Sequence, residues 1–115
     1  MNKPLLLDAN AILRFLLDDN HAQYLQVREK ITNDDCFTIP SVIQESVYVL
    51  NGFYNVPREK IRDTFSAFFD IVQINEKDIL IRALQIFTEK PKLDFVDCIL
   101  CGYAECRNVS VFTFD

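Results

Sequence analysis

Short apolar runs separated by helical patterns are the feature that most constrains how this chain can fold. The runs read "LLL", "CFTI", "IVQI" and "VSVFTF" along the sequence. Between them, apolar residues recur three and four positions apart, which is the spacing of an amphipathic helix. Strands that alternate with helices predict a parallel sheet covered by helices. In open sheets of this kind, ligands bind beyond the carboxyl ends of the strands.

The expected fold class is therefore α/β, with three layers and a small parallel sheet of four to five strands flanked by helices on both faces. We expect strands at about 5–7, 36–39, 71–74 and 109–114. Helices should end near residues 17 and 32, open at Pro40 and Pro57, and cover about 76–89 and 94–106. Proline suits the first turn of a helix, where its missing N–H is not needed.

Length and charge limit the classes of function. A chain of 115 residues is expected to form one domain. It contains neither an apolar run near the ~20 residues of a membrane span nor a signal peptide pattern, so we expect a cytoplasmic protein. The net charge of −5 argues against a broad basic surface for nucleic acid. It does not exclude a nucleic-acid substrate if acids hold divalent cations.

The cysteines are better explained by packing than by metal binding. Cys98 and Cys101 form a C-x-x-C pattern, which is compatible with zinc or redox chemistry. A second such pair is missing, and the one histidine, His21, is far away in sequence. We therefore expect Cys36, Cys98, Cys101 and Cys106 to be buried free thiols, without disulfides.

Acidic residues follow the predicted strands. Asp8 comes directly after the first strand, and Glu45 lies in the helix after the second. Asp94 and Asp97 begin the helix that precedes the last strand, and Asp115 follows that strand. Because the carboxyl ends of parallel strands share one edge of the sheet, we expect these acids to converge there. The sequence thus predicts an acidic cluster at that edge.

Helical geometry indicates which way several of these acids face, and an N-cap role remains an alternative for Asp8 and Asp94. Asp94 and Asp97 lie about 60° apart around their helix and share a face. Glu45 lies about 40° from Val49, at the border of the apolar arc, which indicates that Glu45 is directed toward the interior seam. Asp8 and Asp94 also stand where a helix begins, and aspartate is a favoured N-cap residue.

Carboxylates that converge need a compensating charge. Two of them about 4 Å apart repel by about 1 kcal/mol in water and about 4 kcal/mol at an effective dielectric constant near 20. They must take up protons or bind a cation, and the base nearest to Asp8 in this motif is Arg14. Mg²⁺ or Mn²⁺ suits carboxylate and water ligands. Such ions activate water and hold a phosphodiester for in-line attack.

The segments "LLLDANAILRFLL", "IPSVIQESVYVL", "DFVDCILCGYA" and "VFTFD" resemble, in order and spacing, the four motifs of PIN-domain ribonucleases. The closest resemblance is to the VapC-like toxins of bacterial toxin–antitoxin pairs. The resemblance implies a small parallel sheet between helices and Mg²⁺- or Mn²⁺-dependent endonucleolytic cleavage of RNA. It also implies a homodimer and inhibition by a cognate antitoxin.

The resemblance assigns roles to residues of this chain. The implied catalytic acids are Asp8, Glu45, Asp94 and Asp97, and the implied metal ligands are Asp8, Glu45, Asp97 and Asp115. Asn10 and Thr113 match polar positions that orient ligands or water. Apart from the resemblance, Arg14 lies one turn beyond Asn10, which makes it a candidate to meet a substrate phosphate.

One departure from the family concerns the end of the chain. Family members usually continue past the last acid with a short helix and often another strand, whereas this sequence stops at Asp115. We therefore expect 1–115 to be a single PIN-like domain that is truncated after the last acidic motif. A carboxylate at a frayed terminus is a poor fixed ligand, so Asp115 is the weakest of the expected ligands.

Two other functions remain as alternatives. Phosphatases of the haloacid-dehalogenase type also begin with aspartate after an apolar strand, but they usually have a second aspartate where this chain has Asn10. A PIN fold kept as a non-catalytic binding module is the other alternative. Such a module would be expected to lose at least one core acid, whereas this chain retains them all.

Overall fold

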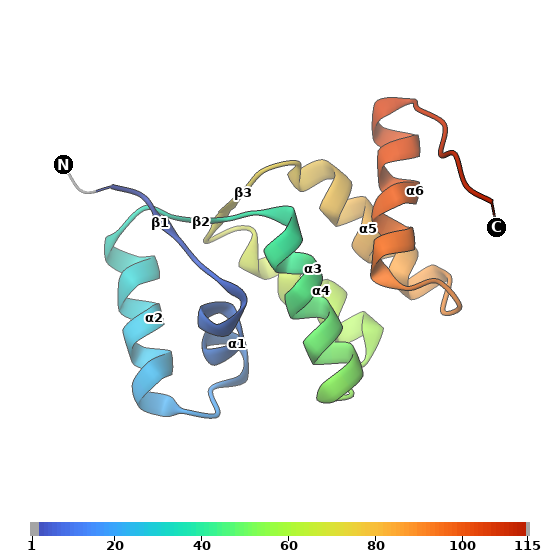
Figure 1. The fold of residues 1–115 in the computed structure, drawn as a ribbon. Coiled ribbons are helices and arrows are strands. Elements are labelled where there is room, and N and C mark those ends of the chain that lie inside the picture. Colours follow the sequence, from blue (N-terminus) through green and yellow to red (C-terminus); the bar gives the residue numbers. More distant parts are fainter. Residues whose placement is uncertain (1–2, 115) are drawn as a thin grey trace.

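The computed structural model describes residues 3–114 and contains a parallel sheet, as the alternation predicted. Its strands are β1 (Leu5–Leu6), β2 (Cys36–Thr38) and β3 (Gln73–Ile74), in the order β1-β2-β3. Both neighbouring pairs are parallel. Figure 1 shows the strands beside one another at one end of the molecule, with the helices packed around and beyond them.

Helices connect the strands and continue beyond the sheet. They are α1 (Ala9–Leu17), α2 (His21–Asn33), α3 (Pro40–Tyr48), α4 (Arg58–Phe68), α5 (Lys77–Glu89) and α6 (Phe95–Arg107), together with the π-helix η1 (Val49–Phe53). The first crossover consists of α1 and α2, and the second consists of α3, η1 and α4. The predicted helix boundaries are close to these, and the helix predicted to open at Pro40 is α3 followed by η1.

The core lies between the helices and fixes where the strands end. Its fully buried side chains include Ile12, Ile43, Ile61, Phe65, Leu84 and Phe87. Thr38 is a buried polar residue at the end of β2, and its hydroxyl donates a hydrogen bond of 3.0 Å to the carbonyl of Leu7. Because Asp8 follows Leu7 and α3 follows β2, this bond ties together the chain segments that carry Asp8 and Glu45.

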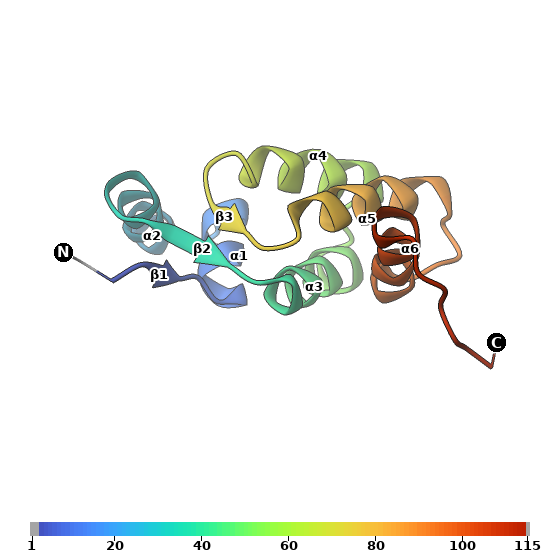
Figure 2. The same ribbon diagram turned by 90° about the horizontal axis from the view of Figure 1, so that it is seen from above.

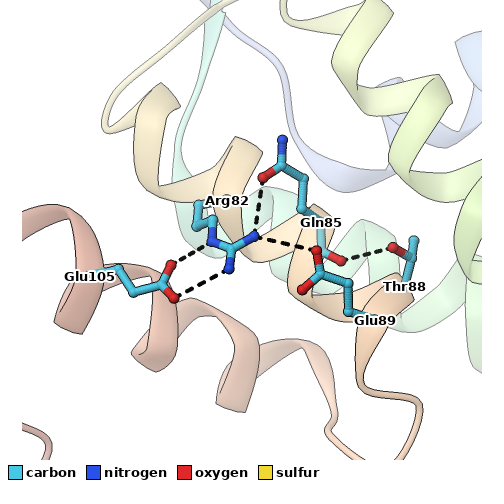
Figure 3. A network of polar contacts seen from close by, with 5 residues as sticks. All are labelled: Arg82, Gln85, Thr88, Glu89 and Glu105. Carbon is cyan, nitrogen blue, oxygen red and sulfur yellow. Dashed lines mark hydrogen bonds and ion pairs between the residues drawn. The ribbon is translucent and has the colours of Figure 1, made fainter.

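Helix α6 packs closely against α5. Gly102 is buried in this contact, and two ion pairs lie beyond it toward the end of α6. Arg82 on α5 binds Glu105 on α6 and also Gln85 and Glu89 on its own helix (Figure 3). The hydrogen bond from Arg82 lowers the pKa of the Glu105 carboxyl below its usual value. The last turn of α6 is thereby held at a fixed place relative to α5.

A second ion pair joins the end of α6 to the start of α5. Arg107, in the last turn of α6, donates to Asp78 in the first turn of α5 at 2.6 Å. This hydrogen bond lowers the pKa of the Asp78 carboxyl. Together the two ion pairs and the glycine contact make α5 and α6 one antiparallel unit.

The predicted last strand is wrong for the residues that the structure describes. Residues 109–114 follow α6 as an exposed segment outside the three-stranded sheet. Phe112 and Phe114 are 86% and 94% exposed. Figures 1 and 2 show this segment and β1 at opposite ends of the long axis, because α6 runs alongside α5 and ends away from the sheet. The sheet of four to five strands is therefore not seen in residues 3–114, and Asp115 lies outside the described residues.

The cysteines are free, as expected, but they are not all buried. Cys36 and Cys98 are buried, Cys101 is half-buried and Cys106 is exposed. Cys106 therefore corrects the expectation of four buried thiols, because the last turn of α6 faces solvent. Burial raises the pKa of the Cys98 thiol to about 11, so this thiol is an inert packing group.

No helix within residues 3–114 is long and apolar enough to cross a membrane.

The α5–α6 contact predicts that Gly102→Ala destabilises the fold. A methyl group at this position would lie 2.9 Å from the carbonyl oxygen of Ile79 and 3.3 Å from its Cγ2. The clash should lower the free energy of unfolding by about 1–3 kcal/mol, despite the better helix propensity of alanine. Urea denaturation followed by circular dichroism measures this change.

Gly52→Ala is the matched control. A methyl group at Gly52 would meet no atom within 4 Å, so this variant should be neutral or more stable by up to about 1 kcal/mol. Equal stability of the wild type and Gly102→Ala would contradict the close contact between α5 and α6.

Candidate functional site

Asp8 is held by the first turn of the helix that it precedes. Its backbone is extended (φ −84°, ψ 177°), and its Oδ1 accepts a hydrogen bond of 2.8 Å from the Ala11 amide. Asp8 is exposed and lies at the positive end of the α1 dipole. Since the cap uses Oδ1, Oδ2 is the atom that a cation at Asp8 would take. The N-cap and metal-ligand interpretations are therefore compatible.

Asp94 has nearly the same geometry at the start of α6. Its φ is −78° and its ψ is 174°, and its Oδ1 accepts a hydrogen bond of 2.8 Å from the Asp97 amide. Asp97 itself lies in the first turn of α6 and is exposed. Both carboxylates of this pair are thus at the positive end of a helix dipole.

Glu45 and Asp94 line the same cavity. This cavity has a volume of about 450 Å³ and lies between α3 with η1 and the start of α6. The two residues are distant in sequence and come from different elements, so their proximity is a product of the fold. Glu45 is exposed, which corrects the expectation that it is directed toward the interior seam. The buried face of α3 is instead formed by Ile43, Ser46 and Val47.

The remaining acids do not form a complete metal site with this pair. Within residues 3–114, no three side chains of His, Cys, Asp or Glu are grouped closely enough to hold a metal ion. Helix α3 packs against both α1 and α6, so it is the element that connects the segments carrying Asp8, Glu45 and Asp97. The donor chemistry, with exposed carboxylate oxygens at one cavity, suits a divalent cation. The full set of ligands is not assembled in this arrangement.

Asn10 and Arg14 lie on α1. Asn10 is exposed in the first turn, beside Asp8. Arg14 is half-buried in the second half of the helix and pairs with Asp19 at 3.4 Å, about 9 Å of helical rise from Asp8. Its Nε is a buried nitrogen without a hydrogen-bond partner in the described part of the chain. A phosphate bound by Arg14 would therefore compete with Asp19.

Thr113 lies in the exposed segment after α6. The described arrangement puts this segment at the far end of the molecule from β1 (Figures 1 and 2), so Thr113 is not brought beside Asp8. Its predicted role in orienting ligands or water remains a prediction.

Sequence reasoning missed Arg58, which lines the cavity and binds the loop beside it. Its Nη1 donates to the carbonyls of Phe87 at 3.0 Å and Leu93 at 2.7 Å, and lies 3.5 Å from that of Lys90. Its guanidinium carbon lies 3.9 Å from the centre of the Phe87 ring. These contacts fix the loop that ends at Asp94. An arginine in the first turn after Pro57 gives no signal of this role, because its partners are backbone groups far away in sequence.

The cap at Asp8 gives a prediction that separates its structural role from a chemical one. Asp8→Ala removes the hydrogen bond to the Ala11 amide and should lower the free energy of unfolding by about 1 kcal/mol. Asp8→Asn keeps an equally good cap, so its stability should stay within about 0.5 kcal/mol of the wild type. Urea denaturation of the two variants measures both values. Equal stability of Asp8→Ala and Asp8→Asn would show that the cap contributes nothing.

Comparison with known proteins adds the family. A model of the PIN domain family matches residues 5–115. Searches of curated proteins and of solved structures found no significant match. PIN domains are commonly nucleases and typically depend on divalent metal ions. Because the match extends over nearly the whole sequence, this chain belongs to the PIN domain family.

Proposed function

We propose that this protein is a Mg²⁺- or Mn²⁺-dependent endoribonuclease and the VapC-like toxin of a toxin–antitoxin pair. The observation that carries the proposal is that Glu45 and Asp94, from separate elements, line one cavity. Family membership over residues 5–115 supports a nuclease fold. The sequence also retains an acid at each motif position, including Asp8, Asp97 and Asp115.

Each acid has a role in this proposal. Asp8, Glu45 and Asp97 would hold the divalent ion, with Asp115 as a further ligand. When bound, the ion would supply a Lewis acid that makes water a stronger nucleophile and offsets negative charge on the phosphate. Asp94, whose Oδ1 is fixed by the Asp97 amide, would accept the proton that the attacking water loses. Water adds to phosphorus as the bond to the leaving oxygen breaks.

The Cys98 thiol, which follows Asp97 in the sequence, is not a candidate nucleophile for this reaction. The Cys98 thiol is buried, and burial raises its pKa to about 11. Its thiolate fraction near neutral pH is therefore very small, and a thiol in this state is a poor nucleophile. A phosphatase that uses Asp8 as a covalent nucleophile would also need a partner acid where this chain has Asn10.

The biological partners follow from the same proposal. Exposed aromatic side chains, including Phe112 at 86% and Phe114 at 94%, are candidate contacts for a homodimer or for binding of an antitoxin. The free cysteines suit the reducing cytoplasm, where we place the protein.

A non-catalytic PIN-fold binding module is the second candidate function. The observation in its favour is that no group of three potential ligands is assembled in residues 3–114. A module of this kind would bind its partner equally well with and without divalent ions.

Cleavage of single-stranded RNA in Mn²⁺, with and without chelator, tests the proposal. We expect cleavage that the chelator abolishes. Glu45→Gln and Asp97→Asn should each reduce the rate by about 100-fold or more, since each removes a charged ligand worth several kcal/mol in the transition state.

Glu29→Gln is the matched control, because Glu29 is an exposed glutamate on α2. This variant should cleave RNA at the wild-type rate. Cleavage that persists in chelator, or that is unchanged in Glu45→Gln, would refute the metal mechanism. A complete lack of cleavage by the wild type would favour the binding module.

A further inference from the structure

We propose that the cavity between α3 and α6 is a nucleobase subsite, in which Tyr48 stacks on a base of the RNA strand. The inference rests on the proposed ribonuclease function for its biological substrate. It adds a site for the base beside the acids that would act on the phosphate. Three properties of the cavity support the inference: its size, the residues of its walls and its charges.

The cavity has the size and the surfaces of a small-molecule site. Its volume of about 450 Å³ lies within the range of roughly 300–1,000 Å³ that is usual for ligand pockets. Tyr48, Phe95 and Val96 supply apolar walls, and the Tyr48 side chain is reachable because the residue is 76% exposed. Single-stranded RNA is recognised by stacking of splayed bases on aromatic rings of this kind.

Hydrogen-bonding groups line one side of the cavity in a regular order. Ser41, Gln44, Tyr48 and Asn51 all line it, and they follow one another three and four residues apart. That spacing puts them on one face of α3 and its continuation η1. Asn51 is held by a 3.1 Å hydrogen bond from its Nδ2 to the carbonyl of Val56, which leaves Oδ1 to accept from a ligand. Amide and hydroxyl groups of this kind pair with base edges.

The charges of the cavity favour an uncharged ligand group over a phosphate. Glu45 and Asp94 line it, and their carboxylates repel an anion. The cation among its lining residues is Arg58, whose guanidinium donates to backbone carbonyls and lies over the Phe87 ring. A neutral aromatic base therefore fits the cavity better than a phosphate group does.

The same pattern disfavours a partner helix as the occupant. A helix in a groove is held by apolar anchors at helical spacing, whereas this face of α3 presents serine, glutamine and asparagine beside one tyrosine. Amide and hydroxyl groups that line a cavity together with an aromatic ring match a base better than an apolar helix face does.

Titration of the ¹⁵N-labelled full chain with the four ribonucleosides tests the subsite without phosphate, metal or catalysis. We expect chemical-shift changes concentrated at Gln44, Tyr48 and Asn51, including their side-chain amides where present. Tyr48→Ala should weaken binding of the preferred nucleoside about tenfold, because it removes the stacking ring. Tyr48→Phe should keep most of the affinity.

Phe53→Ala is the matched control. Phe53 is as exposed as Tyr48, at 77% against 76%, but it does not line the cavity. This variant should bind nucleosides like the wild type. Equal losses in Phe53→Ala and Tyr48→Ala, or shift changes spread over the surface, would overturn the subsite.

RNA cleavage then separates the two proposals. If the cavity binds a base, Tyr48→Ala should raise the KM for RNA several-fold and leave kcat nearly unchanged. Metal-dependent cleavage without nucleoside binding would overturn the subsite and leave the proposed function standing. Nucleoside binding at Tyr48 without any cleavage would support the subsite and refute the ribonuclease.

Discussion

The hydrogen bonds at the starts of α1 and α6 are the interactions on which the candidate site depends. Asp8 and Asp94 each accept one bond of 2.8 Å from an amide of the helix that follows. Each bond fixes one carboxylate oxygen at the positive end of a helix dipole. The acids are thus oriented by the backbone itself, before any ligand enters. A residue that caps a helix in this way can still present its second oxygen to a cation.

The position of α3 decides which acids meet. It packs against α1 on one side and α6 on the other, and the Thr38 hydroxyl ties the start of this region to the end of β1. Glu45 and Asp94 consequently line one cavity. Arg58 adds a further constraint, because its bonds to the carbonyls of Phe87 and Leu93 hold the loop that leads to Asp94. Glu45 and Asp94, the cavity that they line and the hydrogen bonds of Arg58 therefore form one connected unit.

Local signals explain what the sequence could predict. Pro40 marks the start of α3, and Asp8 and Asp94 mark the starts of α1 and α6, since caps and prolines act within one helical turn. Non-local effects explain the rest. The alternating pattern of residues 109–114 indicates a preference for a β-strand. A strand forms only beside an edge of the sheet, however, and this segment lies at the opposite end of the molecule from β1. The exposure of Glu45 and the bonds of Arg58 likewise depend on elements distant in sequence.

Calorimetric titration with Mn²⁺ at neutral pH tests whether Asp8, Glu45 and Asp97 act together on one divalent cation. We expect saturable binding by the wild type. We also expect an affinity at least about tenfold weaker in Glu45→Gln, with no change in Glu29→Gln. Mn²⁺ binding of equal strength in the wild type and Glu45→Gln, or no binding by the wild type, would refute the proposed metal site.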